Sequence, residues 1–217
     1  MTQINKQKSE VLKKKTDETV DKKTHLYIDG TNLFAGQNEL FGPQKYLSFK
    51  YLLKEIDKLI NIDQTYFYAS YMNRKNRLTP ILRDLIASEA LFYKEVRNTA
   101  KTSFYKGHRS PVSGKEKGVD VHLAVDIVKD AFLGNCKHIA VMTGDADLIY
   151  PIEIVKLFNI STSAIFLPNR FSLEMAYKVD KAFTLNFLDK FKADRKLPKQ
   201  LKIITIKKPR MVNIRGK

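Results

Sequence analysis

Residues 25–32 read HLYIDGTN, a short apolar run that ends in an aspartate and then turns polar. Short runs of this kind, closed by glycine and asparagine, are typical of buried strands. A second such run, at residues 138–147, reads HIAVMTGDAD and ends beside Asp145 and Asp147. The two stretches predict two strands of one sheet, each with a carboxylate at its carboxyl end.

Outward from these runs, short apolar segments alternate with helical patterns of apolar residues. Strands are predicted at residues 25–29, 65–72, 93–97, 138–143 and 162–167, helices at 48–60, from 79 onward, at 120–133, 148–158 and 172–179, and a last apolar segment at 182–188. Strands that alternate with helices in this way indicate βαβ units. The predicted fold is therefore α/β, a doubly wound and mostly parallel sheet with helices on both faces in three α/β/α layers.

The chain of 217 residues is long enough for one well-buried domain with tails. Residues 1–24 are expected to form a polar extension, residues 25–191 the domain, and residues 192–217 a basic tail. The alternative for part of that tail is a short edge strand that uses three isoleucines, Ile203, Ile204 and Ile206.

The cysteine content and the apolar runs bear on location. The single cysteine, Cys136, excludes an intrachain disulfide and a thiolate metal cluster, and we expect it to be a packed thiol. No apolar run approaches the roughly 20 residues that span a bilayer, and the first 24 residues lack the apolar segment of a secretory signal. A cytoplasmic protein with no membrane partner is the expectation.

The formal net charge of +16 is larger than solubility requires. A lysine-rich proteome is one explanation, but the charge is clustered, which favours a nucleic acid as partner. Part of it lies in a basic segment at residues 101–118, predicted to be a loop whose side chains bind nucleic acid. Its basic residues are Lys101, Lys106, Arg109, Lys115 and Lys117. Phe104 and Tyr105 in the same segment either stack on bases or anchor the loop to the core.

Four aspartates are predicted to converge at one edge of the sheet. Ligands of parallel α/β sheets bind at the carboxyl ends of the strands, and Asp29, Asp120, Asp145 and Asp147 all fall there. Like charges this close repel unless a cation lies among them, and oxygen ligands alone suit Mg²⁺ or Mn²⁺. The four carboxylates are therefore predicted to be both metal ligands and catalytic residues in phosphodiester hydrolysis.

Neighbouring residues are assigned supporting roles. Asn32 and Thr143 are predicted to orient water or phosphate, and Lys117 either holds a phosphate or is a solvated loop charge. Because the basic segment at 101–117 leads into the helix that carries Asp120, its charges are expected at the mouth of this site. Gly30 and Gly144 would let the backbone approach a ligand closely. Asp126 is expected to lie outside this group of four aspartates and nearer to His122, and His122 and His138 are expected to have structural roles.

Each aspartate also has a purely structural explanation. Asp29 followed by glycine could close a tight turn, Asp120 could be a helix N-cap, and Asp145 with Asp147 could cap the next helix. Each explanation is reasonable singly, but together they require separate coincidences at one sheet edge.

Three motifs occur in a characteristic order, YIDGTNL (27–33), KGVDVHLAVD (117–126) and TGDADL (143–148). Together they resemble the NYN domain, the LabA-like branch of the PIN-like nuclease superfamily, over about residues 25–188. The resemblance implies a PIN-like sheet of strand order 3-2-1-4-5 and a divalent-metal endoribonuclease site. A departure is Leu148, where the family often has phenylalanine.

The acidic positions of this family carry over to Asp29, Asp120, Asp145 and Asp147, and its polar motif residue carries over to Asn32. The function expected is that of a metal-dependent ribonuclease acting on RNA, with a homodimer as the expected assembly. Because some members of the family are regulators, a nucleic-acid-binding module with little catalysis is the alternative. A haloacid-dehalogenase-type phosphohydrolase is disfavoured, because Tyr27 stands where that chemistry needs an aspartate.

Overall fold

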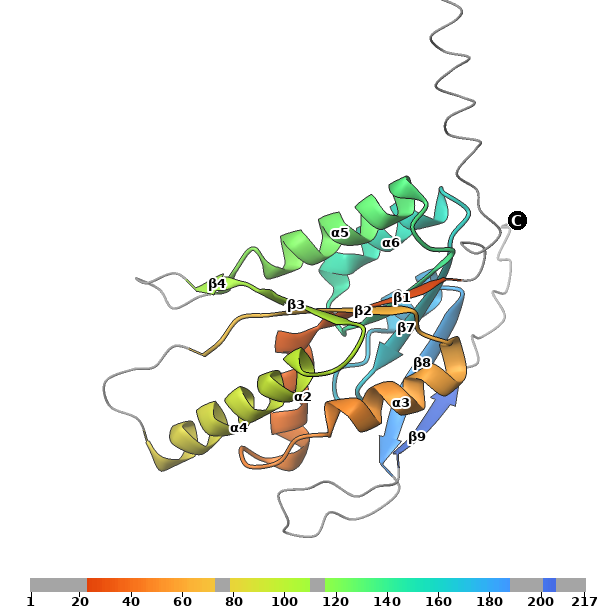
Figure 1. Ribbon diagram of the computed structural model, residues 1–217. Helices are drawn as coiled ribbons and strands as arrows, with labels where there is room; N and C mark the ends of the chain where they lie inside the picture. The colour runs from red at the N-terminus through yellow and green to blue at the C-terminus, as the bar shows by residue number, and fades with distance from the viewer. Residues whose placement is uncertain (1–22, 73–78, 110–115, 188–200, 206–217) are drawn as a thin grey trace, which may run out of the picture.

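The computed structural model describes residues 23–72, 79–109, 116–187 and 201–205 (Figure 1). They form a seven-stranded sheet in the order β3-β2-β1-β6-β7-β8-β9 and a separate two-stranded ribbon of β4 and β5. Neighbouring strands of the sheet run parallel, except that β9 pairs antiparallel with β8. The strands are β1 Thr24–Asp29, β2 Gln64–Ala69, β3 Thr102–Lys106, β4 His108–Arg109, β5 Glu116–Lys117, β6 His138–Met142, β7 Ser161–Phe166, β8 Lys181–Phe187 and β9 Leu201–Thr205.

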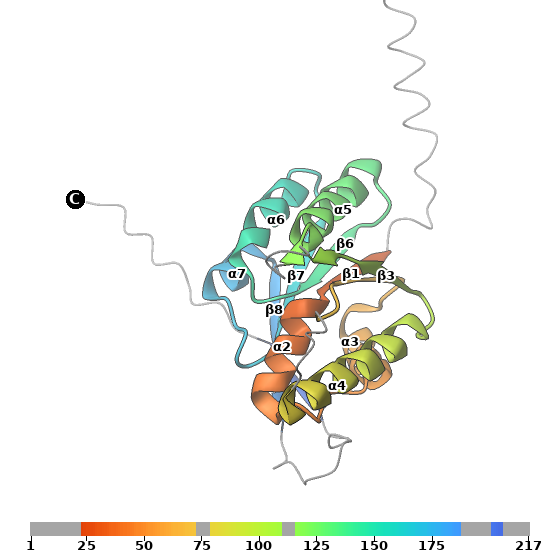
Figure 2. The same ribbon diagram turned by 90° about the vertical axis from the view of Figure 1, so that its left-hand side faces the viewer.

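Helices cover both faces of the sheet, so the predicted three-layer α/β/α architecture is confirmed (Figure 2). One face carries α2 Gly30–Phe41, α3 Phe49–Ile60 and α4 Pro80–Arg97. The other face carries α5 Val119–Leu133, α6 Ile149–Lys156 and α7 Leu173–Lys178, with the short 3-10 helix η2 Ala146–Leu148 before α6. The predicted order 3-2-1-4-5 corresponds to β3-β2-β1-β6-β7, and β8 and β9 extend the sheet beyond it.

The two cores follow from the alternation of side chains along each strand. Leu26 and Ile28 of β1 pack into the core under α2, α3 and α4, whereas Tyr27 packs into the core under α5, α6 and α7. On α3, Phe49, Leu52, Ile56 and Ile60 are buried, the spacing of one helical face that the sequence predicts. The central strands are therefore buried on both faces, as parallel sheets require.

The third strand lies elsewhere than predicted. Residues 93–97 continue α4 to Arg97, and Tyr93 and Val96 are buried on the face of that helix. The short run of aromatic and β-branched residues resembles a strand, but it completes the helical spacing that begins at Ser88 and Phe92. The third strand is β3, inside the segment at 101–118 that was predicted to be a loop, and the two-residue strands β4 and β5 lie in the same segment.

A further helix was not predicted at all. α2 begins directly after β1, with Asp29 as its N-cap, and its polar sequence GTNLFAGQNELF has few apolar residues to mark a helix. Only Leu33, Phe34 and Phe41 of its large apolar side chains are buried.

Part of the predicted tail belongs to the sheet, because β9 (residues 201–205) pairs with β8. Ile206 and the rest of that tail lie outside the described residues, as do residues 1–22 of the predicted extension and Lys115. Within the described ranges, no helix is long and apolar enough to cross a membrane.

Candidate metal centre

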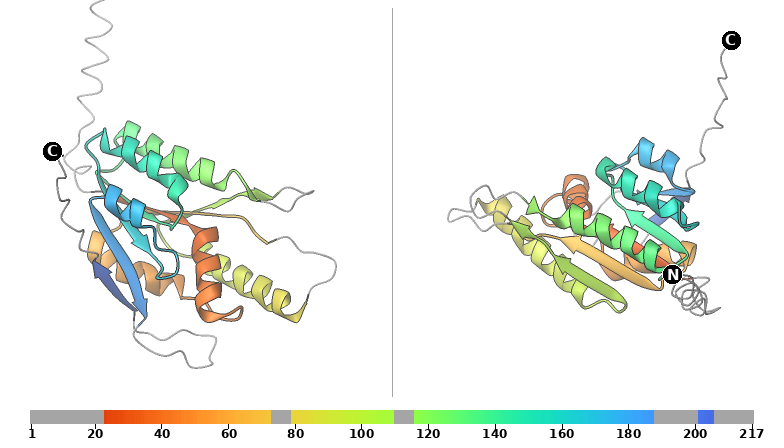
Figure 3. Two further views of the ribbon diagram at one scale, coloured as in Figure 1. Left: turned by 180° about the vertical axis from the view of Figure 1, so that it is seen from behind. Right: turned by 90° about the horizontal axis from the view of Figure 1, so that it is seen from above.

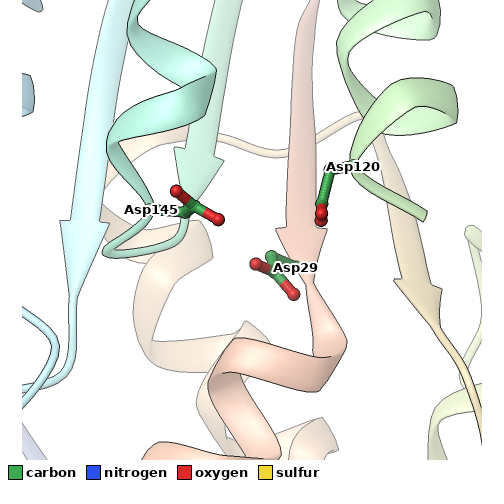
Figure 4. Close-up of side chains that lie close together, drawn as sticks. All are labelled: Asp29, Asp120 and Asp145. Carbon is green, nitrogen blue, oxygen red and sulfur yellow. The ribbon is translucent and has the colours of Figure 1, made fainter. Parts of the chain in front are cut away.

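Three aspartates from distant parts of the chain meet at the carboxyl edge of the sheet (Figure 4). Asp29 is the last residue of β1, Asp145 follows β6, and Asp120 stands in the first turn of α5. One carboxylate oxygen from each lies within 4.8 Å of the others. The pairing of β1 with β6, in which Ile28 lies beside Met142, accounts for the closeness of the two strand ends.

The burial of the three carboxylates is graded. Asp29 is 4% exposed, Asp145 is half-buried and Asp120 is exposed. The cluster is therefore anchored in the core on the side of β1 and open to solvent on the side of α5.

Both oxygens of Asp29 are oriented by neighbours. One accepts a hydrogen bond from the backbone N–H of Asn32 at 2.9 Å, which makes Asp29 the N-cap of α2. The other accepts a hydrogen bond from the hydroxyl of Thr143 at 3.2 Å. The Asp29 carboxylate thus has the cluster position that the sequence predicts and also caps α2, a helix that starts where the structural explanation placed a tight turn.

Thr143 and Asn32 connect the two strand ends. The buried Thr143 oxygen also accepts a hydrogen bond from the backbone N–H of Asp145 at 3.0 Å. The side-chain oxygen of Asn32 accepts one from the backbone N–H of Gly144 at 3.3 Å. These bonds give both side chains a part in positioning the carboxylates, in addition to the contact with water or phosphate predicted for them.

Packing inside the protein by itself requires the two glycines at this edge, and a close approach of a ligand to their backbone stays a prediction. A Cβ added at Gly30 would lie 2.1 Å from the ring of Phe67. One added at Gly144 would lie 2.2 Å from the backbone oxygen of Arg170. Neither position has room for any side chain, with or without a ligand.

Asp147 lies apart from the other three predicted ligands. Among the described residues, the group whose oxygens lie within 4.8 Å of one another comprises Asp29, Asp120 and Asp145 only. The exposed Asp147 donates its backbone N–H to the carboxylate of Asp145 at 3.0 Å, which caps η2. The Asp147 carboxylate is therefore not part of the group in which the sequence spacing placed it.

The N-cap of α5 is Gly118, so the alternative in which Asp120 caps this helix is wrong. Gly118 has a φ of 79°, in the left-handed region that glycine adopts without strain. Asp120 follows it within the first turn, next to the positive end of the helix dipole, which stabilises a negative charge.

Asp126, on the same helix, lies outside the cluster, as predicted. It accepts hydrogen bonds from the hydroxyl of Tyr68 at 2.9 Å and from the ammonium of Lys129 at 3.0 Å. His122, its predicted neighbour, stacks on Tyr105 with ring centroids 4.4 Å apart.

One buried polar network was not predicted. Asp130 of α5 accepts hydrogen bonds from the hydroxyl of Tyr27 and from the side chain of Asn135 at 2.8 Å, and its other contact is with His25 Nδ1 at 2.7 Å. Burial alone would raise the pKa of Asp130, but the hydrogen bonds from His25, Tyr27 and Asn135 outweigh it and lower that pKa to about 2. Burial, together with the bond to Asp130, raises the pKa of the Tyr27 hydroxyl well above its ordinary value.

A signal for this network was present in the sequence. Tyr27 lies inside an apolar strand, and a buried phenol needs a hydrogen-bond partner. Asp126 and Asp130 are four residues apart and so share one face of a predicted helix. That face turns toward the tyrosines of β1 and β2 rather than toward Asp29.

The predicted nucleic-acid-binding residues are distributed over both ends of β3. Lys106 lies at its carboxyl end, on the same edge as the cluster, with its ammonium 5.4 Å from the ring centre of Tyr71. Lys101 precedes the amino end of β3, so the expectation that it lies at the mouth of the cluster is wrong. Arg109 and Lys117 lie on the two strands of the ribbon, in which Arg109 pairs with Glu116 and Lys117 pairs with His108.

Two other expectations about side chains can be compared with the structure. Phe104 stacks on Phe67 with ring centroids 5.4 Å apart, and Tyr105 packs on Tyr68 and His122, which supports an anchoring role for both aromatic residues. Cys136 is fully buried, as expected of a packed thiol, and burial raises its pKa to about 12.

An α/β/α sandwich with carboxylates gathered at the carboxyl edge of its central strands is the arrangement of a PIN-like nuclease domain. The chain belongs to the NYN domain family, whose model matches residues 23–186, and so to the PIN-like nuclease superfamily. A search of curated proteins finds no match. Among solved structures, the chain is similar to a protein of unknown function from Vibrio parahaemolyticus, with a TM-score of 0.57 and 13% identity over 78% of this chain and 96% of that one. At this identity the likeness shows the fold alone.

Proposed function

We propose that the protein is a divalent-metal-dependent endoribonuclease of the NYN family. The observation that carries this proposal is the group of three carboxylates, Asp29, Asp120 and Asp145, whose oxygens lie within 4.8 Å of one another at the carboxyl edge of the sheet. A purely oxygen donor set of this size fits Mg²⁺ or Mn²⁺, which prefer carboxylate and water ligands.

In this proposal Asp29, Asp120 and Asp145 hold the cation. When bound, it would supply polarisation of a phosphate oxygen and a lowered pKa for an attacking water. Thr143 keeps Asp29 and Asp145 in register through its two hydrogen bonds, and the N-cap bond from Asn32 fixes the rotation of Asp29. The exposed Asp147 is assigned an outer role, in contact with water or substrate rather than with the cation.

RNA is the proposed substrate because the chain carries a net charge of +16, which attracts a polyanion. Lys106 ends β3, and Arg109 and Lys117 lie between β3 and α5, so their backbone positions lie at the edge that carries the cluster. Together with Lys115, they are proposed to hold the phosphate backbone, and Lys101 is proposed to contact RNA at the opposite edge. The LabA-like branch and a cytoplasmic location stay predictions.

The test is incubation of the purified full chain with single-stranded and duplex RNA and DNA, in the presence of Mn²⁺, Mg²⁺ or EDTA. Internal cleavage of RNA is expected with either metal and none with EDTA. Asp29→Asn and Asp145→Asn are each expected to slow cleavage at least about 1,000-fold, because the cation supplies several kcal/mol of transition-state stabilisation. Asp147→Asn should slow it less than about tenfold, the effect of an outer-shell contact.

A measurement of metal binding separates the cluster from the reaction. At about 100 times its dissociation constant, Mn²⁺ should stabilise the wild type by roughly 2.7 kcal/mol and leave Asp145→Asn unchanged in a thermal unfolding experiment. Unaltered cleavage in both Asp29→Asn and Asp145→Asn would overturn the proposed site. RNA binding without turnover would favour the alternative, a nucleic-acid-binding regulatory module.

A further inference from the structure

The outer faces of α5 and α6 carry large apolar side chains that the core does not use. On α5, Val121 is 65% exposed, Val125 57% and Phe132 71%. On α6 and the turn that follows, Tyr150 is 70% exposed and Leu157 75%. The two helices lie side by side on the upper surface of the molecule, and no described element covers them (Figure 3, right).

Both helices already bury one apolar face against the sheet. Leu123 and Ile127 of α5 and Ile152 and Val155 of α6 are fully or almost fully buried. A helix that is apolar on its outer side as well as its inner side is typical of a helix with partners on both sides.

The apolar outer faces of α5 and α6 meet in a groove of about 560 Å³. Its walls include Val125, Val128 and Phe132 from α5, and Tyr150, Ile154 and Phe158 from α6 and the turn after it. The rings of Phe132 and Phe158 meet edge to face at the end of the groove, with centroids 6.2 Å apart. The outer faces of the two helices therefore form one continuous apolar surface rather than a set of separate side chains.

The groove carries almost no charge, which is unusual for a chain with a net charge of +16. The one charged residue among those that line the groove is Lys129, and its ammonium pairs with the Asp126 carboxylate at 3.0 Å. A second molecule of the same charge is repelled from most of the surface but not from this face.

We propose that this surface, the α5–α6 face, is the interface of a twofold homodimer. The exposed side chains named above, with Leu133 and Phe158, offer on the order of 700 Å² of apolar surface, given about 150–250 Å² for each large aromatic side chain. That exceeds the roughly 300–600 Å² of the largest patch on a typical monomer and is close to the ~800 Å² per partner of a standard interface.

A second copy of the chain also offers a surface of matching size and polarity. In a twofold interface the same patch serves both partners, so an apolar face meets an apolar face of equal size. Packing of one α5–α6 pair on another leaves few polar groups without hydrogen bonds, because the groove is almost wholly apolar. The proposal does not depend on the proposed nuclease activity.

The test is the mass of the full chain in solution, by light scattering coupled to size-exclusion chromatography in about 0.5 M salt, which suppresses bridging by residual nucleic acid. The wild type is expected at twice its chain mass of 25.1 kDa. Phe132→Glu and Tyr150→Glu are each expected to give the monomer mass, because a carboxylate would be buried in an apolar interface.

Ile81→Glu is the matched control. Ile81 is 68% exposed on α4, across the sheet, and the substitution changes the charge by the same amount. This variant should remain a dimer. Circular dichroism verifies the fold of each variant, and Leu157→Glu, at the most exposed of these positions, replaces any variant that does not fold.

Two results would overturn the proposal: a wild type that stays monomeric at about 100 µM, or folded Phe132→Glu and Tyr150→Glu variants that stay dimeric. In the first case the face would belong to a different protein partner or to a lipid surface. Since cleavage is not measured, failure here leaves the proposed nuclease function unaffected.

Discussion

Helix α5 contributes carboxylates to two acidic regions that differ in what surrounds each carboxylate. In its first turn, Asp120 faces the carboxylates of Asp29 and Asp145. Further along, Asp126 and Asp130 face hydrogen-bond donors of the chain itself. The same residue type on one helix is thus gathered with like charges at one place and compensated by the fold at the other.

The difference in surroundings indicates that one region serves the stability of the fold and the other its function. Asp130 has three partners within the protein, and its lowered pKa shows that the folded state favours its charged form. The carboxylates of Asp29, Asp120 and Asp145 repel one another, and a cation among them would offset this repulsion. The like charges of the cluster therefore lower the stability of the fold, whereas the network around Asp130 raises it.

The largest expected effect contrasts Asp120 with Asp126. Asp120→Asn is expected to slow metal-dependent RNA cleavage at least about 1,000-fold, because it removes a proposed ligand. Asp126→Asn should slow cleavage less than about tenfold and lower the free energy of unfolding by about 1 kcal/mol, the worth of a hydrogen bond to Tyr68. Single-turnover cleavage and urea unfolding of both variants would measure this, and the reverse ranking of rates would show that the two regions are assigned wrongly.

A smaller effect concerns the network around Asp130. Asp130→Ala is expected to lower the free energy of unfolding by about 3 kcal/mol, because the buried His25 and Tyr27 and the exposed Asn135 all lose their partner. Urea unfolding near neutral pH measures it. The control is Asp147→Ala at an exposed position, which should stay within about 0.5 kcal/mol of the wild type. Equal stability of the two variants would mean that the network contributes nothing.

The smallest effect is a dependence of stability on pH. The pKa of Asp130 is lowered from 3.8 to about 2 in the folded protein, so its stabilising contribution is complete above about pH 4 and is lost as the pH falls toward 2. The loss should amount to about 2 kcal/mol. In Asp130→Asn this component is absent, so the difference in unfolding free energy between the wild type and this variant should narrow between pH 4 and pH 2. A difference that stays constant over that range would contradict the assignment.

Much of the fold could be predicted because its signals are local. The helical spacing of Phe49, Leu52 and Ile56 and the apolar run before Asp29 are each contained in a few residues. The misplaced third strand had no such signal, since the aromatic run that ends at Arg97 fits a strand as well as the last turns of a helix. Pairing with Gln64–Ala69, a contact with a distant part of the chain, selects Thr102–Lys106 instead.

The sequence by itself determined the α/β class, the family and the acidic character of the edge, because strand ends, helix periodicity and the three motifs are properties of short segments. Only the tertiary structure decided which carboxylates meet. The turn at Gly118 and the packing of Val119 against Gly107 set the start of α5, and that start brings Asp120 to Asp29. The rotation of the same helix turns Asp130 toward the buried tyrosines and leaves an apolar face outward. Such a rotation depends on the sum of contacts along the whole helix, so no spacing within a short motif could have specified it.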